Sequence, residues 1–392
     1  MNPWRGIGRL PKEVWVLCGT TLINRMGTMG LPFLVVYLTN SQGYSATQAG
    51  LVFSIYGAAA FVAAPFSGRL SDAIGPLRVM KLSLWFSGVI LILYPLAQVF
   101  SVVIVATICW SVITEAFRPA ALSIISDIVE PDQRKVAFSA NRLAANLGMS
   151  IGPALGGFLL LYSFPLIFWV DGATSLIAGL VLTLMMVRDP RHRRLFEMPR
   201  KPRIFVLRDL KLLFFIIALF PFFITIFQIY STLPYVCVHD LGLASSIFGL
   251  FFTINTALII TLEVPLNIAM SHWPHRQSMA LGGFLIGVGF GGMMFASGFW
   301  SVVVTVVIWT FGEMILIPAS SAYVADIASY ERRGAYMGIY QMTGNAALAF
   351  SAMFGMRLLE AAGASALWGV AFLACTVSSF LFLFLRKHSR QS

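Results

Sequence analysis

The sequence predicts an all-α integral membrane protein, with 12 transmembrane helices in two pseudo-symmetric six-helix bundles. Of its 392 residues, 58% are hydrophobic and only 11% are charged, and the mean hydropathy of +0.83 does not fit a water-exposed globular surface. The apolar residues form runs of about 20, which is the length a helix needs to cross the hydrocarbon core. Short polar breaks separate the runs, and the two halves of the chain resemble each other.

The apolar runs predict helices in chain order. They are continuous and lack a two-residue alternation, which disfavours a β-barrel, because backbone polar groups in lipid must be satisfied within the segment or across a closed sheet. The first run follows a basic start but is too long for a signal peptide, so we expect it to stay in the mature protein. The expected spans are 14–38, 47–67, 79–99, 102–124, 138–161, 165–187, 211–237, 245–268, 278–298, 301–324, 336–358 and 365–385.

The distribution of basic residues predicts the orientation, since Lys and Arg near helix ends stay on the cytoplasmic side. With the N-terminus inside, all of the 27 Lys and Arg residues lie in cytoplasmic segments except Arg25, Arg118, Arg142 and Arg357, which lie within spans. We therefore expect both termini in the cytoplasm of a multi-pass protein of the cell (inner) membrane. The net charge of +11 is spread over many short loops, which indicates the lipid bilayer and no nucleic acid as partner.

An internal repeat relates the two halves, because several residues recur at an offset of 199 positions around the fourth span of each half. The matching pairs are Trp110 with Trp309, Pro119 with Pro318, Asp127 with Asp326, and Arg134 with Arg333. We expect an N-terminal bundle over 1–187, a basic cytoplasmic linker over 188–211 and a C-terminal bundle over 212–392. Parallel repeats of this kind place a substrate site between the halves, near the middle of the membrane.

The cysteines and the known cofactor motifs indicate no enzyme. All four cysteines fall inside predicted spans, so neither a disulfide framework nor a metal site is expected. The chain has no phosphate-binding loop, dinucleotide fingerprint or nucleophile elbow at a strand-to-helix junction. We expect no cofactor, and an ATP-driven pump is disfavoured.

Two motifs resemble those of the major facilitator superfamily. The loop from Gly68 to Arg78 is similar to the G-x-L-x-D-x-x-G-x-x-R loop of that superfamily, and the segment from Gly148 to Gly157 is similar to the glycine-proline signature of its drug/proton antiporter branch, the multidrug exporters. The resemblance covers essentially the whole chain. It implies the major facilitator fold, and a loop that bolts the two halves together on the cytoplasmic side when the carrier opens outward.

The first motif also has a direct physical interpretation. Asp72 lies where the second span ends and a tight turn at Gly75 begins, so it can oppose Arg78 or reach a partner across the loop. The alternative is a solvated pair of charges that serves orientation alone. The residues assigned to the cytoplasmic latch are Gly68, Asp72, Gly75, Arg78 and Asp127.

The second motif predicts close helix packing. Gly148, Gly152 and Gly156 lie on one helix face, which lets another backbone approach closely, while Pro153 removes a hydrogen bond and permits a bend beside Gly157. The equivalent positions of the second half lack the proline and most of the glycines. The motif is therefore expected to serve the first half alone, either in restricting proton leak, as the resemblance to antiporters implies, or in ordinary helix packing.

Charged residues in the middle of spans are the strongest indication of function, because each costs several kcal/mol unless it is paired or faces water. Glu115 and Glu313 lie at similar depth in the two halves and, with Glu263, are the candidates for proton coupling. Such a carboxylate can load and release a proton as access alternates between the two sides. The alternative for Glu115 is a permanent ion pair with Arg25.

Further polar and aromatic side chains in the spans would form an amphipathic substrate site. The candidates are Arg25, Asn24, Gln228, Tyr230, Asn255, Gln341, Asn345 and Trp110. Arg118 and Arg142 are expected to reach lipid headgroups or to pair with Asp127.

The favoured function is proton-coupled efflux of a small amphipathic molecule by alternating access, with the proton gradient as energy source and the protein acting as a monomer. Drug exporters often carry an acid on the first helix and an arginine on the fourth, whereas this chain has Arg25 and Glu115. This reversal disfavours cationic drugs and leaves open a substrate carboxylate at Arg25. The alternatives are uptake of a sugar, organic acid or lysolipid by symport or uniport, and a non-transporting sensor.

Overall fold

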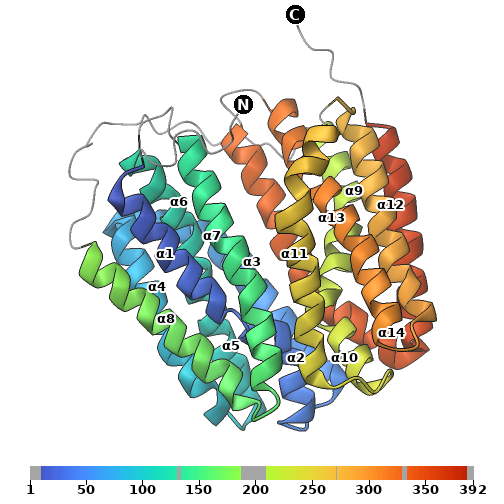
Figure 1. Cartoon of the computed structure of the whole chain (residues 1–392), viewed down its shortest axis with the longest axis horizontal. Coiled ribbons are helices and arrows are strands. Elements are labelled where there is room, and N and C mark those ends of the chain that lie inside the picture. The colour runs from blue at the N-terminus through green and yellow to red at the C-terminus, as the bar shows by residue number, and fades with distance from the viewer. Residues whose placement is uncertain (1–9, 130–133, 187–208, 271, 329–332, 386–392) are drawn as a thin grey trace, which may run out of the picture.

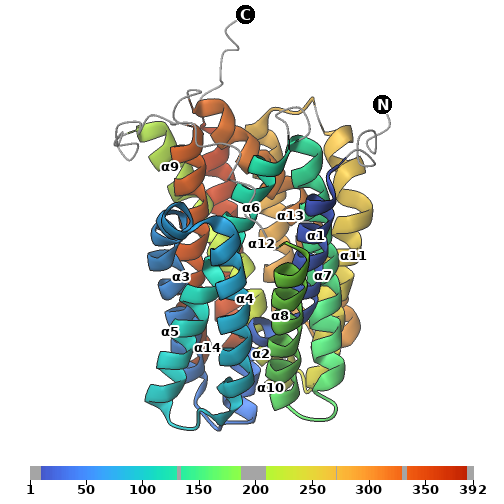
Figure 2. The same cartoon turned by 90° about the vertical axis from the view of Figure 1, so that its left-hand side faces the viewer.

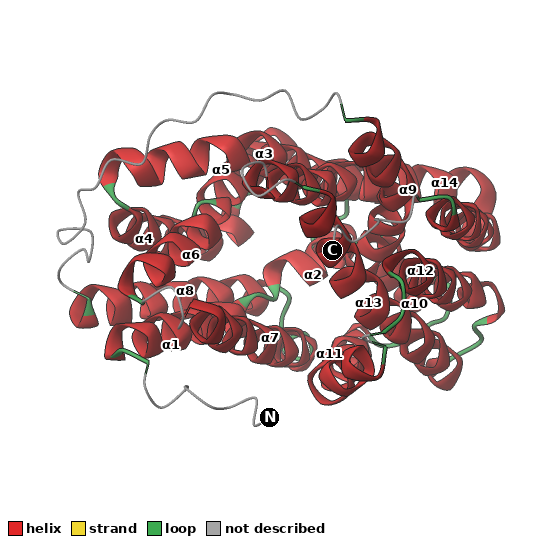
Figure 3. Cartoon of the chain, turned by 90° about the horizontal axis from the view of Figure 1, so that it is seen from above, coloured by secondary structure: helices red, strands yellow, loops and turns green. Residues whose placement is uncertain are grey.

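The computed structural model describes residues 10–129, 134–186, 209–270, 272–328 and 333–385, and every regular element in these ranges is a helix. Figure 3 shows the helices from above as two groups that meet near the centre. In Figure 1 the group on the left holds the first half of the chain and the group on the right holds the second half. The all-α prediction is therefore confirmed for the described residues.

The described residues of the first half form eight α-helices and one 3-10 helix. They are α1 (Lys12–Gly27), α2 (Gly30–Asn40), α3 (Ala46–Ile74), α4 (Pro76–Leu93), η2 (Tyr94–Leu96), α5 (Phe100–Glu115), α6 (Phe117–Ile128), α7 (Arg134–Leu159) and α8 (Pro165–Met185). The second half contains α9 (Leu210–Phe227), η5 (Gln228–Tyr230), α10 (Thr232–His239), α11 (Ser245–Ala269), α12 (His275–Gly292), η6 (Met293–Phe295), α13 (Phe299–Ile327) and α14 (Arg333–Leu383).

Ten segments of the described chain are long and apolar enough to cross a membrane. The expected count was twelve, and two features account for the difference. The helix α14 counts once over Tyr336–Leu383, although non-helical Gly363 (φ 79°, ψ 172°) divides it into two arms. The 26-residue α7 is not among the ten, because its sequence is rich in small and polar residues. Of the expected linker 188–211, only the last three positions lie within the described residues.

Three of the expected spans contain a break that the apolar pattern does not reveal. The first span divides at Thr28 and Met29 into α1 and α2, and the fourth divides at Ala116 into α5 and α6. The seventh narrows into the 3-10 helix η5 between α9 and α10. These breaks free backbone N–H and C=O groups in the middle of a span, where other protein groups must satisfy them.

Corresponding elements of the two halves begin 199 residues apart. The pairs of starting positions are 46 and 245 (α3, α11), 76 and 275 (α4, α12), 94 and 293 (η2, η6), 100 and 299 (α5, α13), and 134 and 333 (α7, α14). Gly43 (φ 71°) and Gly242 (φ 63°) stand at the same offset and adopt the same left-handed backbone conformation. The offset seen in a few residue types thus extends to the three-dimensional structure.

Helices of the two halves meet along two crossings, where α3 packs against α14 and α7 packs against α11. These crossings correspond to each other under the repeat, because α11 matches α3 and α14 matches α7. Within the first half, α8 packs against α1 and α4, and Figure 2 shows these three helices from the side that faces away from the second half. The outer surface carries many exposed large apolar side chains, among them Val105, Ile217, Phe295, Trp300 and Phe380, as expected for contact with lipid.

The buried core has two parts. The larger cluster includes residues of both halves, such as Phe33 and Phe248, whose rings meet edge to face at 5.8 Å. The smaller cluster belongs to the first half alone and includes Val14, Met80 and Ile125. The two halves also meet through α2 and α10, which pack together at one end of the molecule. In Figure 1 this end lies at the bottom, opposite the edge where α1 begins and α14 ends.

Candidate functional site

Glu115 is the last residue of α5 and precedes the break at Ala116. The side-chain amide of Asn345, on α14 of the other half, donates a 3.3 Å hydrogen bond to its Oε1. No Lys or Arg nitrogen of the described residues lies within 4.0 Å of this carboxylate, and the side chain is partly exposed. Glu115 is therefore held across the two halves by one neutral group.

Glu313 lies on α13 and is also held by an amide. Asn255 of α11 donates to its Oε2 at 3.1 Å and to the hydroxyl of Thr310 at 2.9 Å. The carboxylate has no salt bridge among the described residues, and the charge of Glu263 acts on it. Each of the two membrane carboxylates thus accepts a hydrogen bond from an asparagine and forms no salt bridge among the described residues, although Arg118 and Arg25 act electrostatically on Glu115 alone.

Arg25 lies on α1 and has no salt-bridge partner among the described residues. Glu115 and Arg118 act on it electrostatically, as do the hydroxyl groups of Tyr56 and Tyr230. The permanent ion pair between Arg25 and Glu115 that the sequence left open is not formed in this structure. The guanidinium therefore remains available to an anionic group.

The two other arginines within spans of the first half, Arg118 and Arg142, contact the second half. With the Gln341 amide oriented so that its oxygen faces Arg118, both terminal guanidinium nitrogens lie 3.3 and 3.1 Å from that oxygen. Arg142 of α7 forms a 2.8 Å salt bridge with Glu263 of α11. The expected pairing of Arg118 or Arg142 with Asp127 concerns a side chain that lies outside the described residues.

Three of the expected substrate residues make contacts within the protein in this structure. Gln228 is only 2% exposed, and its amide bonds the backbone oxygen of Ser351 at 2.9 Å. Trp110 is 3% exposed and packs on Tyr56, Tyr94 and Phe168. Asn24 donates to Ser175 of α8 at 3.2 Å, within its own half. Sequence cannot make this distinction, because the buried and cavity-facing sides of a membrane helix use the same polar residue types.

Tyr230 differs from these because it lies between the halves. Its ring stacks on Phe53 of α3, at a centroid distance of 6.4 Å, and on Phe252 of α11, at 5.6 Å. The side chain is partly exposed, and its hydroxyl acts electrostatically on Arg25. Of the expected substrate residues, Arg25, Tyr230, Asn255, Gln341 and Asn345 therefore lie around the two carboxylates.

The glycines of α7 face two different partners. A Cβ on Gly148 or Gly152 would meet the backbone of α1 near Arg25, and one on Gly156 would meet Phe33 and Met29. A Cβ on Gly157 would stand 2.4 Å from the backbone oxygen of Ser246 on α11. The first three glycines thus seat α7 against the broken first span, and Gly157 seats it against the other half. Pro153 lies inside the helix, as expected.

The loop motif is described through its backbone. The helix α3 ends at Ile74, Gly75 adopts φ 89°, and α4 begins at Pro76, so the expected tight turn is present. Gly68 and Asp72 lie in the last turns of α3 and Asp127 near the end of α6, but their side chains lie outside the described residues. Arg78 is exposed on the first turn of α4.

Asp171 was not among the predicted site residues, although it is an acid inside an apolar span. It lies on α8, is 5% exposed, and its Oδ2 accepts hydrogen bonds from the backbone N–H groups of Met29 (3.3 Å) and Gly30 (3.0 Å). The carboxylate therefore binds the break in the first span. The partners are 142 and 141 residues apart in the chain, so no local pattern reveals the contact.

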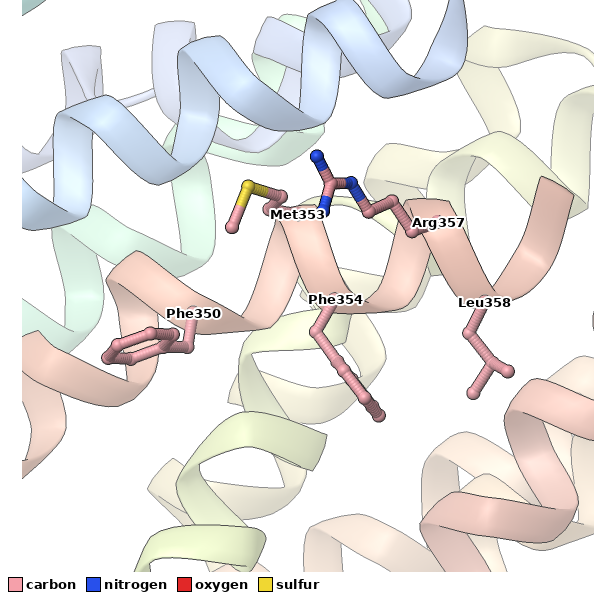
Figure 4. A pocket seen from close by; sticks show the side chains of 5 residues that line it. All are labelled: Phe350, Met353, Phe354, Arg357 and Leu358. Carbon is pink, nitrogen blue, oxygen red and sulfur yellow. The ribbon is translucent and has the colours of Figure 1, made fainter. Parts of the chain in front are cut away.

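Contacts between the halves also occur near the start of α3. Glu360 of α14 accepts from the backbone N–H of Thr47 at 2.8 Å and bonds its hydroxyl, and Ser54 accepts from the backbone N–H of Met353 at 2.9 Å. A shallow apolar groove of about 360 Å³ lies beside them, along α14. Figure 4 shows the five residues that line it: Phe350, Met353, Phe354, Arg357 and Leu358.

Comparison with known proteins identifies the family. The sequence profile of the Major Facilitator Superfamily matches residues 17–243 and 215–392. The chain belongs to the major facilitator superfamily.

Relatives within this superfamily are distant. The chain is 26% identical to the uncharacterized MFS-type transporter YqjV of Bacillus subtilis (strain 168), over 86% of this chain and 83% of that protein. It is 24% identical to the quinolone resistance protein NorA of Staphylococcus aureus (strain N315), over 46% of each chain. The likeness to NorA thus covers less than half of either protein.

Solved structures share the fold. A crystal structure of the peptide transporter POT in complex with sulfate has a TM-score of 0.81 at 18% identity, covering 95% of this chain and 94% of that one. A mutant of the nucleoside transporter NupG has a TM-score of 0.79 at 12% identity, covering 95% and 99%. This major facilitator protein is therefore a multi-pass membrane protein and a secondary transporter of the superfamily's kind.

Proposed function

We propose that this major facilitator protein is a proton-coupled exporter of small amphipathic molecules that carry an anionic group. The observation that carries the proposal is the pair Glu115 and Glu313, one from each half, each bonded to a neutral asparagine. A carboxylate in a salt bridge must lose its partner before it takes up a proton, whereas one held by an amide need not. Both side chains are suited to exchange protons as access alternates.

The proposed substrate class follows from Arg25. A guanidinium without an acidic partner in the middle of a span is costly, and an incoming carboxylate would offset that cost through a charge-assisted pair of hydrogen bonds. The ring of Tyr230, stacked between Phe53 and Phe252, adds an aromatic surface for the apolar part of the molecule. The name of NorA, quinolone resistance protein, agrees with such a substrate, since quinolones are aromatic carboxylic acids.

The proposal includes a particular architecture. We place twelve spans in the membrane by counting α7 and both arms of α14, which gives two six-helix halves, 1–187 and 212–392, joined by the linker 188–211. Both termini then lie in the cytoplasm, in the inner membrane of a cell, and the protein acts as a monomer. The positions of the basic residues support this orientation.

Alternating access would exchange one set of contacts between the halves for another. In this structure α2 and α10 pack together at one end, and the bonds of Glu360 to Thr47 and of Met353 to Ser54 join α3 to α14. The salt bridge of Arg142 with Glu263 joins α7 to α11. Proton uptake at Glu115 would weaken its bond with Asn345, which is itself a contact between the halves, and so bias the exchange.

Transport in proteoliposomes tests the proposal directly. Purified protein would be reconstituted with an imposed pH gradient, and the flux of a quinolone would be followed by its fluorescence. We expect quinolone to move against the proton flux, Glu313→Gln to abolish gradient-driven transport while leaving counterflow intact, and Arg25→Gln to abolish both. Asp240→Asn is the matched control, because it changes an exposed acid that lies outside the candidate site. Full gradient-driven activity in Glu313→Gln would overturn the coupling role.

The unpaired Arg25 also favours a second candidate, the uptake of an organic acid by proton symport. The same proteoliposomes separate the two, because symport would carry the anion with the protons rather than against them. Transport of a quinolone that persists in Arg25→Gln would contradict the anionic substrate class in both cases.

A further inference from the structure

We propose that Asp171 is a proton-sensitive positioning residue, which holds the two parts of the first span in register and releases them when it is protonated. This inference deepens the proposed function, because it adds a third acid to the coupling machinery. The role of Asp171 in transport rests on the proposed proton coupling. The switch itself is a local property of the structure.

The geometry places the carboxylate at the N-terminus of α2. This helix begins at Gly30, has 11 residues and receives no hydrogen bond from its own N-cap residue, Met29. The first N–H groups of any helix lack partners within the helix, and here the Oδ2 of Asp171 accepts from two successive ones, at Met29 and Gly30. A side chain of α8 thus supplies the cap that the α2 sequence lacks.

The site is closely built around this contact. A Cβ on Gly30 would stand 3.2 Å from the Oδ2 of Asp171, 3.3 Å from the ring of Trp110 and 3.4 Å from the ring of Phe168. On the other side, a Cβ on Gly27 would clash with Thr174, one turn along α8. The glycines on each side of the break let the carboxylate reach the backbone, and the aromatic rings exclude water from it.

A proton would break this contact for a definite reason. The ionised carboxylate is stabilised by two N–H groups and by the partial positive charge of the helix N-terminus. The protonated carboxyl group keeps one acceptor oxygen but loses the charge, and with it most of the attraction for the helix end. Burial opposes the ionised form, so the two effects work against each other at this residue.

The charged neighbours of Asp171 are few. From α1, Arg25 acts on it electrostatically, and from α3 the hydroxyl of Tyr56 does so. The residues that touch the contact from α5 and from α8 itself are Trp110 and Phe168, which do not titrate. Arg25 therefore links Asp171 to the proposed substrate site, because a bound anion would neutralise a cation that favours the ionised carboxylate.

The corresponding break in the second half has no such switch. There the Nε2 of Gln228 donates to the backbone oxygen of Ser351, and its Oε1 accepts from the hydroxyl of Thr232 at 2.8 Å. The position that corresponds to Asp171 is Val370. A neutral amide holds this break whatever the pH, so the comparison isolates the carboxylate as the responsive element.

Hydrogen–deuterium exchange tests the switch without any substrate. The full-length protein in lipid nanodiscs would be exchanged at about pH 8 and at about pH 5. Protection factors would be corrected for the intrinsic pH dependence of exchange. Peptides that cover 27–34, at the first break, would then be compared with peptides that cover 226–234, at the second. We expect protection of the first segment to fall about tenfold at the lower pH, the scale of a hydrogen bond to a charged group. Protection of the second segment should not change.

Two variants make the result decisive. Asp171→Asn should show low protection of 27–34 at both pH values, because asparagine mimics the protonated form. Ser175→Ala, which removes the bond from Asn24 one turn further along α8, should keep the pH response of the wild type. A purely structural cap predicts the opposite, since asparagine caps helices about as well as aspartate: protection in Asp171→Asn would then equal that of the wild type. That result, or a wild type without a pH response, overturns the proposal.

Transport measurements separate this inference from the proposed function. If the exchange data show the switch and the pH profile of transport flattens in Asp171→Asn, both stand. If the exchange data show the switch but no substrate moves with or against protons, the coupled exporter fails and the local switch remains. If gradient-driven transport occurs and keeps its pH profile in Asp171→Asn, the exporter stands and the role of Asp171 in its cycle fails.

Discussion

The two broken spans, α1–α2 and α9–η5–α10, occupy the same place in the repeat but are held by different chemistry. In the first half the carboxylate of Asp171 reaches the break from another helix. In the second half Gln228 lies within the break and bonds α14. A break at the corresponding place is therefore held once by a titratable group and once by a neutral one. The difference indicates that the first half responds to protons at its break, while the second half provides a fixed frame.

The crossings between the halves show a similar contrast. Where α7 meets α11, Gly157 and Gly249 bring the two backbones together, since a Cβ on Gly249 would stand 2.4 Å from the backbone oxygen of Pro153. The corresponding pair in the other crossing is Gly50 and Met356, and a Cβ on Gly50 would meet the Met356 side chain at 2.9 Å. At these two corresponding positions, one contact is backbone on backbone and the other includes a flexible side chain. The α3–α14 crossing brings backbones together elsewhere, at Gly57, where a Cβ would stand 2.4 Å from the backbone nitrogen of Ala349.

The largest effect is expected from alanine at these corresponding glycines. Gly249→Ala forces α11 away from α7, and overpacking of this kind costs about 1–3 kcal/mol, so transport should fall by about tenfold or more. Gly50→Ala should cost less, because the nearest neighbour is a methionine side chain that can move aside, and the nearest backbone atom, the oxygen of Ala352, is 3.1 Å away. The measurement is the initial transport rate at equal amounts of folded protein. Equal losses in the two variants would show that the crossings do not differ as described.

The second effect concerns the stability of the neutral break. Gln228→Leu removes the acceptor of the buried hydroxyls of Ser231 and Thr232, and each unsatisfied buried group costs about 1–3 kcal/mol. The midpoint of thermal unfolding in detergent should fall by the same amount at about pH 5 and about pH 8, because no group at this break titrates. A loss confined to one pH would contradict the assignment of the second half as the fixed frame.

A smaller effect is expected where the first helix of each half begins. Asp209 caps α9 and accepts hydrogen bonds from the Lys211 backbone and the Tyr336 hydroxyl, whereas Pro11 before α1 makes no side-chain cap. Partial burial raises the pKa of Asp209, but these hydrogen bonds and the Lys211 charge outweigh it, so the pKa lies below its usual value.

The sign of the pH dependence follows from that lowered pKa. A carboxyl group with a lowered pKa stabilises the folded protein above its unfolded-state pKa of about 3.9, and this contribution is lost as the pH falls through the folded-state value. Asp209→Ala should therefore cost about 1 kcal/mol near neutral pH and progressively less in acid. Unfolding curves for the wild type and the variant should converge at low pH, and a constant difference would argue against the cap.

The smallest effect is expected at the salt bridge between α7 and α11. The side chain of Arg142 is 62% exposed, whereas that of Glu263 is 16% exposed, and exposed ion pairs contribute about 0–1 kcal/mol. Arg142→Gln should change transport by about twofold, less so at high salt, and the exchanged pair Arg142→Glu with Glu263→Arg should restore it. A tenfold loss would place Glu263 in proton transfer rather than in contact between the halves.

Much of the architecture follows from the sequence, because apolar runs and basic loops report the membrane directly. The offset of 199 residues, inferred from pairs such as Trp110 with Trp309, is also the offset of the helix starts. The breaks at Thr28 and Ala116 could not be predicted. They lie in apolar runs without a proline at the break, and contacts from distant helices hold them in place.

The candidate site was predicted less completely for a related reason. Sequence gives the depth of a polar residue in the membrane but not the direction in which its side chain points. Glu115 and Glu313 could be selected by depth, whereas Gln228 and Asn24 have suitable depth but point into packing contacts. Asp171, which lies six residues inside α8, was not selected, because its partners are backbone groups that no residue pattern encodes.

The constant offset between the halves also limits how such a chain can change in evolution. From α3 to the start of the last span, the distance along the chain from one helix start to the next is the same in both halves, although single helices differ in length. An inserted residue turns every later position of an α-helix by about 100°, which would direct Gly157 or Gly249 toward lipid and a bulky neighbour into the crossing. Over this stretch the two halves therefore align at an offset of 199 residues without a gap, and they differ in side chains rather than in the spacing of their helix starts.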